Sequence, residues 1–308
     1  MRALVISGGG NKGAFAGGIA EYLIKELKYN YDLFLGTSTG SLLLPLLSIG
    51  KVDEIKEVFS TVTQEKIFSS NPFKYYKNND GTYKVRINHL SILRMFLKNK
   101  KTLGESENLR KLIRQSFTLS DFVELNNSHK KVVVSVANLS RGNVEYKQSD
   151  KCHYLDFCDW VWASSNMVPF MSLVRKYGCD YADGGLGIFI PIKKAIEMGA
   201  LEIDAIVLRT QEKSSKIISS RNALELILNS FSFMINQISV DNIDIANFEG
   251  KDKRIKINYY YIPNELANNV LIFDPNQMSQ WWEDGFEYAA LNNPIVHDSR
   301  RKFLNFFG

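Results

Sequence analysis

Apolar runs of four to eight residues alternate with segments in which apolar residues recur at helical spacing. The runs are typical of buried strands, and the helical spacing predicts amphipathic helices. Gly, Asn, Asp and Ser separate most of these segments, as turns require. We expect strands at 3–6, 31–35, 131–139, 143–148, 203–208 and 255–262. We expect helices at 14–28, 41–49, 52–61, 89–98, 109–117, 156–163, 192–198, 224–245 and 278–291.

Strands that alternate with helices predict a three-layer α/β/α fold with a mainly parallel central sheet. The chain shows no internal repeat and no Pro/Ser-rich linker, so we expect one domain over residues 1–308. Its core motifs lie within 3–210, and a helix, a strand and a helix within 220–308 pack on that core. The long helix at 224–245 places six apolar residues on one face: Leu224, Ile227, Leu228, Phe231, Ile235 and Ile238.

A glycine-rich turn, Gly8-Gly9-Gly10-Asn11-Lys12-Gly13, directly follows the first predicted strand. Glycine lets the backbone adopt positive φ and approach a ligand closely, and N–H groups at a helix N-terminus stabilise negative charge. The pattern G-x-G-x-x-G also occurs in dinucleotide-binding oxidoreductases, which need an acidic residue at the end of the second strand. Asp32 lies at the required sequence distance but at the start of that strand, which makes this alternative the weaker one.

A second motif, Gly36-Thr37-Ser38-Thr39-Gly40, matches G-x-S-x-G between an apolar strand and an apolar helix. In this context the pattern predicts a nucleophile elbow, a turn so sharp that the flanking residues must be small and the serine is exposed to substrate. The N-terminus of the following helix favours the negative charge that develops during reaction. Ser38 is therefore the predicted nucleophile.

A serine nucleophile needs a base. Four histidines are isolated in sequence and make poor candidates: His89, His129, His153 and His297. The last of them has a late position that suits a catalytic triad, but it stands in a polar tail. Asp183-Gly184-Gly185 offers a carboxylate instead, on a turn whose glycines let a partner come close. Two alternatives are an Asp183 that only supports its own turn, and the nearby Asp180, which lacks the glycines.

Together these motifs resemble those of the patatin-like phospholipase family. Family members carry a G-G-G-x-[KR]-G turn, a G-x-S-x-G elbow and a D-G-[GA] turn, in the order found here at Gly8–Gly13, Gly36–Gly40 and Asp183–Gly185. The segment from Ala163 to Phe170, Ala-Ser-Ser-Asn-Met-Val-Pro-Phe, is similar to a further conserved stretch of the family. The likeness covers residues 3–60 and 105–210.

The resemblance implies a serine esterase of the phospholipase A type that hydrolyses fatty acyl esters of phospholipids or lysophospholipids. Ser38 would form the acyl-enzyme and Asp183 would act as the base, so no histidine is required. The backbone N–H groups of Gly8 to Gly13 would form the oxyanion hole. No cofactor is implied.

The sequence departs from the family at Phe189, where the family usually has Asn. This departure supports a second hypothesis, a catalytically weak or inactive patatin-fold module that binds lipid or a partner protein. That hypothesis predicts lipid binding without turnover, whereas the enzyme hypothesis predicts release of fatty acid.

The net charge of +5 is too small to indicate nucleic-acid binding. Residues 74–101, however, contain eight Lys and Arg against one Asp, a net +7, which leaves −2 for the rest of the chain. Tyrosines and aliphatic residues lie between the basic ones, a mixture typical of membrane-interfacial segments. We therefore expect a peripheral membrane contact through 74–101 and no nucleic-acid partner. The alternative is a solvated loop and helix whose apolar face packs on the core.

The three cysteines form no Cys-x-x-Cys or Cys/His cluster, and we predict no metal site. The apolar run at 3–6 is too short for a signal peptide. The longest uncharged stretch, 33–50, contains a Gly- and Ser-rich turn, so it is not expected to span a membrane. These features favour a cytoplasmic protein without signal peptide or transmembrane helix, able to bind a membrane at its surface. The alternative is a protein that is exported without a recognisable signal.

Overall fold

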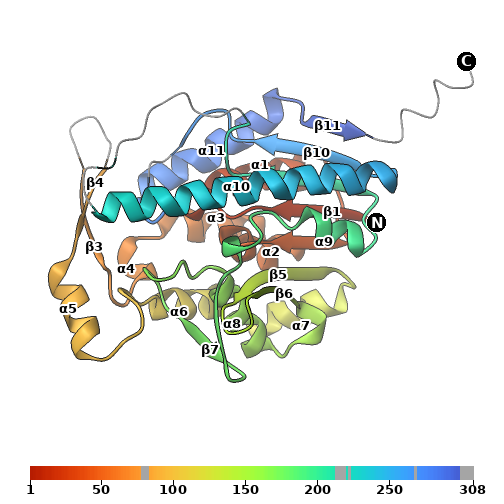
Figure 1. Cartoon of the computed structure of the whole chain (residues 1–308). Coiled ribbons are helices and arrows are strands. Elements are labelled where there is room, and N and C mark those ends of the chain that lie inside the picture. Colours follow the sequence, from red (N-terminus) through yellow and green to blue (C-terminus); the bar gives the residue numbers. More distant parts are fainter. Residues whose placement is uncertain (78–82, 212–219, 221–222, 267–268, 299–308) are drawn as a thin grey trace, which may run out of the picture.

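The computed structural model describes residues 1–77, 83–211, 220, 223–266 and 269–298. Its centre is a nine-stranded sheet in the order β11-β10-β9-β1-β2-β5-β8-β7, with β6 on the other edge of β5 (Figure 1). The strands of this sheet are β1 (Arg2–Ile6), β2 (Leu33–Gly36), β5 (Lys131–Asn138), β6 (Asn143–Gln148), β7 (Val174–Lys176), β8 (Cys179–Asp183), β9 (Glu202–Val207), β10 (Lys256–Tyr261) and β11 (Ile295–Asp298). The five strands from β10 to β5 run parallel, and the outer strands run antiparallel to their neighbours.

Helices cover both faces of the sheet because its parallel strands are apolar on both sides. In β1, Leu4 and Ile6 join the core beneath one set of helices, while Ala3 and Val5 join the core beneath the other. The larger core packs against α1 (Gly13–Glu21), α2 (Thr39–Ser48), α3 (Val52–Thr61), α6 (Glu107–Ser116), α7 (Leu119–Asn127), α8 (Tyr154–Ser164) and α11 (Pro275–Leu291). The smaller core packs against α9 (Ile192–Glu197) and α10 (Ala223–Asp252), which lie in front of the sheet in Figure 1. The predicted three-layer α/β fold with a mainly parallel sheet is confirmed.

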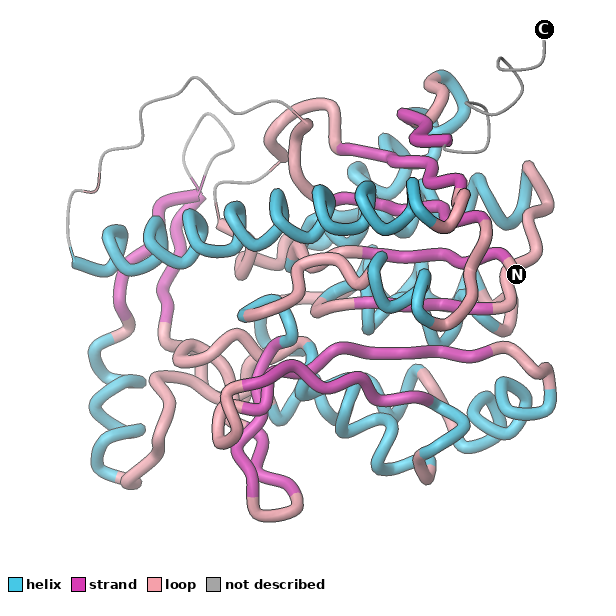
Figure 2. The backbone as a smooth tube through the Cα atoms, turned by 45° about the vertical axis from the view of Figure 1, so that its right-hand side comes forward, coloured by secondary structure: helices cyan, strands magenta, loops and turns pink. Residues whose placement is uncertain are grey.

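A small substructure stands apart from the main sheet at the end toward which the parallel strands run (Figures 1 and 2). It consists of the two-stranded hairpin β3 (Phe73–Lys77) and β4 (Tyr83–Ile87), followed by α5 (His89–Leu97). The short helix α4 (Gln64–Ile67) precedes the hairpin. None of the helices in the described ranges is long and apolar enough to cross a bilayer.

The C-terminal segment shares the main sheet and the larger core. Strands β10 and β11 extend the sheet beyond β9, and α11 packs on α1. Gly17 and Gly18 lie directly against Trp282, whose indole N–H donates to Glu21 at 2.7 Å. A Cβ on either glycine would overlap α11, so the two small residues allow the helices to approach closely.

Several elements differ from the sequence prediction. The expected helix at 14–28 is α1 followed by a π-type turn over Tyr22–Glu26. Strands β3, β4, β7 and β11 and helices α4 and α7 were not predicted, since most are short or carry many polar residues and leave weak periodicity. Ile227 points to solvent and does not join the buried face of α10, and the Leu224 side chain lies outside the described residues. His297 lies in β11 opposite Ile257, where a polar tail was expected.

Candidate active site

Ser38 lies at the turn between β2 and α2 with φ 55° and ψ −122°, in the positive-φ region that non-glycine residues rarely adopt. The turn brings α2 directly against the neighbouring strand. A Cβ on Gly40 would lie 2.3 Å from the carbonyl oxygen of Ile6, so only glycine fits there. The strained backbone at Ser38 and the tight packing at Gly40 are the features that a nucleophile elbow requires.

Two serines from α8 and its C-cap hold the peptide groups of Ser38. The Oγ of Ser164 accepts the Ser38 N–H at 3.1 Å, and the Oγ of Ser165 donates to the Ser38 carbonyl at 3.1 Å. Ser164 also bonds the hydroxyl of Ser41 at 2.8 Å. The sequence analysis noted this Ala-Ser-Ser segment as similar to the family but gave its hydroxyl groups no role. The structure assigns them to supporting the elbow.

Asp183 approaches Ser38 because β2 and β8 meet end to end along one edge of β5. Gly36 at the end of β2 pairs with Val134, and Asp183 at the end of β8 pairs with Val136 on the same edge. Strand β6 occupies the opposite edge of β5. Since β8 runs antiparallel to β5, its carboxyl end faces that of β2, which brings together two residues far apart in sequence.

The Asp183 carboxylate is buried, and burial raises its pKa to about 6. Hydrogen bonds from the Ser38 hydroxyl and the Gly185 N–H oppose this shift, the latter at 2.7 Å to Oδ1. The backbone N–H of Asp183 donates to the Asn166 carbonyl at 2.9 Å, which fixes the strand end. The carboxylate is therefore oriented toward the hydroxyl of Ser38 and is more basic than an exposed aspartate.

The glycine turn places only some of its N–H groups where they could receive negative charge. The N–H of Gly8 donates to the Phe189 carbonyl at 2.9 Å. The N–H groups of Asn11, Lys12 and Gly13 also donate to backbone carbonyls. Four of the six expected oxyanion-hole donors are thus already used to hold the turn together.

Gly9 and Gly10 provide the remaining N–H groups, which donate to no group in the described part of the chain. Gly10 has φ 58°, and a Cβ there would lie 2.2 Å from the Val270 carbonyl oxygen. A Cβ on Gly8 would lie 3.4 Å from the Cβ of Ser38, so this turn borders the elbow directly. Of the six expected donors, Gly9 and Gly10 are thus the two whose N–H groups are not used within the described residues.

The side chains of Asn11 and Lys12 anchor this turn to the loop that follows β10. The amide nitrogen of Asn11 donates to the carbonyls of Asn269 at 3.1 Å and Ile272 at 2.7 Å. The ammonium group of Lys12 pairs with Glu265 at 3.0 Å. The ammonium group of Lys12 and the amide nitrogen of Asn11 thus make structural contacts, whereas the buried Oδ1 of Asn11 has no hydrogen-bond partner among the described residues.

Phe189 packs against the glycine turn and leaves Ser38 and Asp183 in contact. Its ring lies 3.8 Å from the position of a Gly8 Cβ. Its backbone N–H donates to the side-chain oxygen of Asn242 at 2.8 Å. The sequence analysis did not identify Asn242. The residue could have been noticed because it lies four positions from both Ile238 and Ala246, and so is a polar residue on the core-facing side of the helix.

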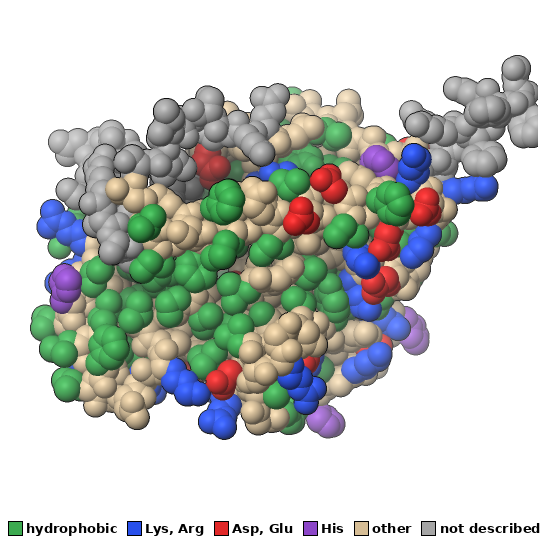
Figure 3. All heavy atoms as spheres, in the orientation of Figure 1, with side chains coloured by type: hydrophobic (Ala, Val, Ile, Leu, Met, Phe, Trp, Pro, Cys, Tyr) green, Lys and Arg blue, Asp and Glu red, His purple; other side chains and the backbone are tan. Residues whose placement is uncertain are grey.

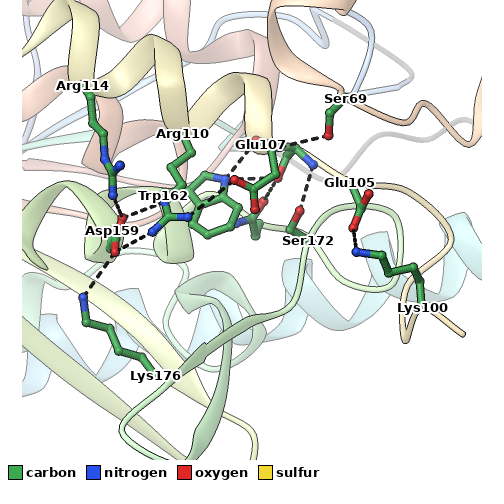
Figure 4. Close-up of polar contacts among 12 residues, drawn as sticks. Ser69, Lys100, Glu105, Glu107, Arg110, Arg114, Asp159, Trp162, Ser172 and Lys176 are labelled. Carbon is green, nitrogen blue, oxygen red and sulfur yellow. Dashed lines mark hydrogen bonds and ion pairs between the residues drawn. The ribbon is translucent and has the colours of Figure 1, made fainter. Parts of the chain in front are cut away.

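A charged cluster fixes α8, the helix that supplies Ser164 (Figure 4). Asp159 of α8 accepts hydrogen bonds from Arg110 at 2.9 Å and Arg114 at 2.7 Å, and Lys176 of β7 lies at 3.4 Å. Burial alone would raise the pKa of Asp159, but the Arg110 hydrogen bonds hold it below its ordinary value. A hollow of about 250 Å³ lies beside this cluster. Of its bordering cations, Arg110 and Lys176 pair with Asp159, whereas exposed Arg175 pairs with no carboxylate among the described residues. The paired cations hold α8 in place.

The dinucleotide alternative fails on geometry. Asp32 accepts the backbone N–H of Arg2 at 2.9 Å, which places it at the start of β1. The glycine turn begins after Ile6, at the other end of that strand, about 15 Å away at the rise of a β-strand. Asp32 is therefore too far away to bind a ribose whose phosphates occupy the turn. Among the described residues, no group of three or more His, Cys, Asp or Glu could hold a metal ion.

The glycine turn, the serine elbow and the aspartate turn meet at the carboxyl ends of a mainly parallel sheet, the layout of α/β proteins that carry a serine on a strand–helix elbow. The sequence model of the patatin-like phospholipases matches residues 4–196. The chain therefore belongs to the patatin-like phospholipase family.

Two further comparisons agree with this placement. The uncharacterized protein YjjU of Escherichia coli strain K12 is 24% identical over 210 residues, which are 68% of this chain and 51% of that protein. The chain thus spans about half the length of this relative. The crystal structure of VipD from Legionella pneumophila has a TM-score of 0.52 at 15% identity, and the match covers 96% of this chain and 68% of that chain. This likeness shows the fold.

Proposed function

We propose that the chain hydrolyses acyl esters of phospholipids or lysophospholipids with Ser38 as nucleophile and Asp183 as base. The contact between the Ser38 hydroxyl and a buried carboxylate whose pKa is raised to about 6 carries this proposal. Family membership supports a lipid hydrolase in general. The identity of the dyad and the substrate class are our inference from the site.

In the proposed reaction, the Ser38 oxygen attacks the carbonyl carbon of the ester while its proton moves to Asp183. The negative charge on the substrate oxygen is stabilised by the N–H groups of Gly9 and Gly10. Collapse of this intermediate breaks the bond to the alcohol, which receives the proton from Asp183. Water then attacks the acyl carbon while one of its protons moves to Asp183. The bond to the Ser38 oxygen breaks, this oxygen takes the proton back from Asp183, and the fatty acid leaves.

The raised pKa of Asp183 helps this reaction in a specific way. A carboxylate with the ordinary pKa near 4 is a weak base toward a hydroxyl, and general-base catalysis improves as the pKa approaches the working pH. With a pKa of about 6, Asp183 is still mostly ionised at pH 7 and holds a proton more strongly than an exposed aspartate. The oxyanion donors stabilise the negative charge of the transition state. In other hydrolases, loss of one such donor lowers kcat by on the order of a hundredfold.

The test is incubation of the purified chain with defined phospholipids and identification of the released products. Ser38→Ala and Asp183→Asn should both abolish release of fatty acid. Asp180→Asn is the matched control, since Asp180 lies on the same strand but bonds Lys101 at the surface. Fatty-acid release that persists in Ser38→Ala, or full activity in Asp183→Asn, would overturn the proposed dyad. Lipid binding by the wild type without any turnover would favour the alternative of an inactive lipid-binding module.

A further inference from the structure

Helix α5 exposes apolar side chains that an ordinary surface helix would bury. Of its nine residues only Met95 is buried. Four others each have more than half of their surface exposed: Leu90, Leu93, Phe96 and Leu97. Most of the apolar side of this helix therefore faces solvent. The alternative from the sequence, in which the apolar face packs on the core, does not hold for these four residues. Clustered exposed apolar side chains of this kind mark interaction sites.

The first half of α10 also exposes apolar side chains. Residues 226–240 contain no charged side chain, whereas residues 241–252 contain five. The inner side of this half packs on the protein through Phe231 and Ile235. Its outer side exposes four large apolar residues: Leu226, Ile227, Phe233 and Met234. A helix that faces water normally carries charged residues on its outer side, so this half of α10 is suited to a less polar environment.

These two helices belong to one continuous surface. Phe170 lies between Phe73 of β3 and Phe231 of α10, with ring centroids at 5.2 and 6.1 Å, and so links the hairpin to α10. Both backbone views place the hairpin beside the first turns of α10, with α5 at the other end of the hairpin (Figures 1 and 2). In the space-filling view, hydrophobic side chains spread between these elements without charged side chains among them (Figure 3).

Basic residues border this surface and lack acidic partners among the described residues. Lys74 stands directly opposite Arg86 across the hairpin, and both are exposed. Like charges in this position repel each other, and an anionic surface would offset the repulsion. Exposed Arg94 on α5 and exposed Lys98 at its C-cap add to the same border.

Two other lysines of this segment are already neutralised. Lys100 pairs with Glu105 at 2.6 Å and Lys101 with Asp180 at 3.1 Å. The net +7 counted over 74–101 thus overstates the charge that a ligand would meet. The unpaired cations gather on the hairpin and α5, next to the exposed apolar residues.

We propose that α5 and residues 226–234 of α10 form a docking face that inserts into the surface of an anionic phospholipid bilayer. Apolar side chains would enter the headgroup and acyl boundary while the bordering cations contact lipid phosphates. The carboxyl ends of the parallel strands, which carry the glycine turn and Ser38, point toward the side of the molecule where α5 and the hairpin stand (Figure 1). The biological purpose of this face rests on the lipid hydrolase activity proposed above, but its binding can be measured independently.

The experiment measures co-sedimentation of the full chain with phosphatidylcholine vesicles, with and without phosphatidylglycerol. It is done in the Ser38→Ala background, so that hydrolysis does not alter the vesicles. The double variant Leu93→Ser/Phe233→Ser should weaken binding by on the order of tenfold or more, because two large apolar side chains no longer enter the bilayer. Lys74→Gln/Arg86→Gln should weaken binding to anionic vesicles by about fivefold per cation and leave binding to neutral vesicles unchanged.

Phe248→Ser is the matched control, because Phe248 lies on the same helix and is 70% exposed, close to the 65% of Phe233. It lies in the charged half of α10 and should bind vesicles like the parent. Equal binding by all variants, or equal loss in Phe248→Ser, would overturn the proposal. A parent chain that forms a dimer and becomes monomeric in Leu93→Ser/Phe233→Ser without binding vesicles would instead identify the face as a self-association surface. A further control is Leu93→Ser/Phe233→Ser with Ser38 intact. This variant should hydrolyse a soluble short-chain ester like the wild type, which would show that it has lost membrane binding and not catalysis.

Discussion

The side-chain oxygen of Asn242 accepts the backbone N–H of Phe189 at 2.8 Å and joins α10 to the turn beside Ser38. The carbonyl of Phe189 in turn accepts the N–H of Gly8 at 2.9 Å. A helix that begins near residue 223 therefore positions the backbone next to the glycine turn. In this chain the position that is usually Asn in the family is Phe189, and an amide from α10 supports the same stretch of backbone.

We expect Asn242→Ala to lower kcat by roughly tenfold with little change in KM, because a small shift of the glycine turn misplaces its N–H groups relative to the developing charge. Asn242→Asp keeps an oxygen acceptor and should restore most of the rate. Asn229→Ala is the control, as Asn229 lies on the same helix and donates to Ser220. Steady-state kinetics of the three variants checks this, and an unchanged kcat in Asn242→Ala would show that α10 does not position the turn.

The burial of Asp183 predicts a pH dependence. Because the base must be ionised, kcat/KM should rise with pH to a plateau, with a midpoint at about pH 6 instead of near 4. Hydrolysis of a soluble ester measured from pH 4 to 8 would show the midpoint. Asp180→Asn should leave the profile unchanged. A midpoint near pH 4 would mean that Asp183 is not the buried base.

The same group predicts a change in stability. The folded-state pKa of Asp183 is raised from 3.8 to about 6, so the folded state holds more protons than the unfolded state between these values. The contribution of this group to stability therefore falls as pH rises from about 4 to 6, by on the order of 3 kcal/mol, and stays low above that range.

Asp183→Asn removes this charge and should raise the free energy of unfolding at pH 8 while abolishing activity. Below pH 4 the difference between variant and wild type should disappear, since Asp183 is then protonated in both states. Denaturant unfolding at the two pH values checks this. A difference that does not depend on pH would contradict the burial of an ionised carboxylate.

Ser164→Ala should lower both stability and kcat. It leaves the N–H of Ser38 without its acceptor, a loss worth about 1–2 kcal/mol, and frees the elbow to move. Ser48→Ala is the control, because Ser48 is equally buried but its hydroxyl donates to the Pro45 carbonyl within α2, away from the elbow. The control should lose stability and keep its kcat when unfolding and ester hydrolysis are measured together. An equal loss of kcat in both variants would show that Ser164 has no particular role in supporting the elbow.

The docking face shows where sequence patterns were ambiguous. A basic and aromatic segment at 74–101 was visible as a local excess of charge, but helical spacing cannot tell whether an apolar stripe faces the core or solvent. The exposed positions of Leu93 and Phe96 resolve this for α5. The apolar outer side of the first half of α10 could be recognised only from the structure, in which Ile227 and Phe233 are exposed.

By itself, the sequence determined the alternation of strands and helices, the three motifs and the candidates Ser38 and Asp183. These are local features, because a strand, a sharp glycine turn and a helix each depend on neighbouring residues. The tertiary structure alone decided which groups meet. The antiparallel pairing of β8 with β5 brings Asp183 to Ser38, backbone bonds leave Gly9 and Gly10 as donors, and α10 supplies Asn242. Such contacts join residues far apart in the chain, and local patterns contain no information about which distant segments pack together.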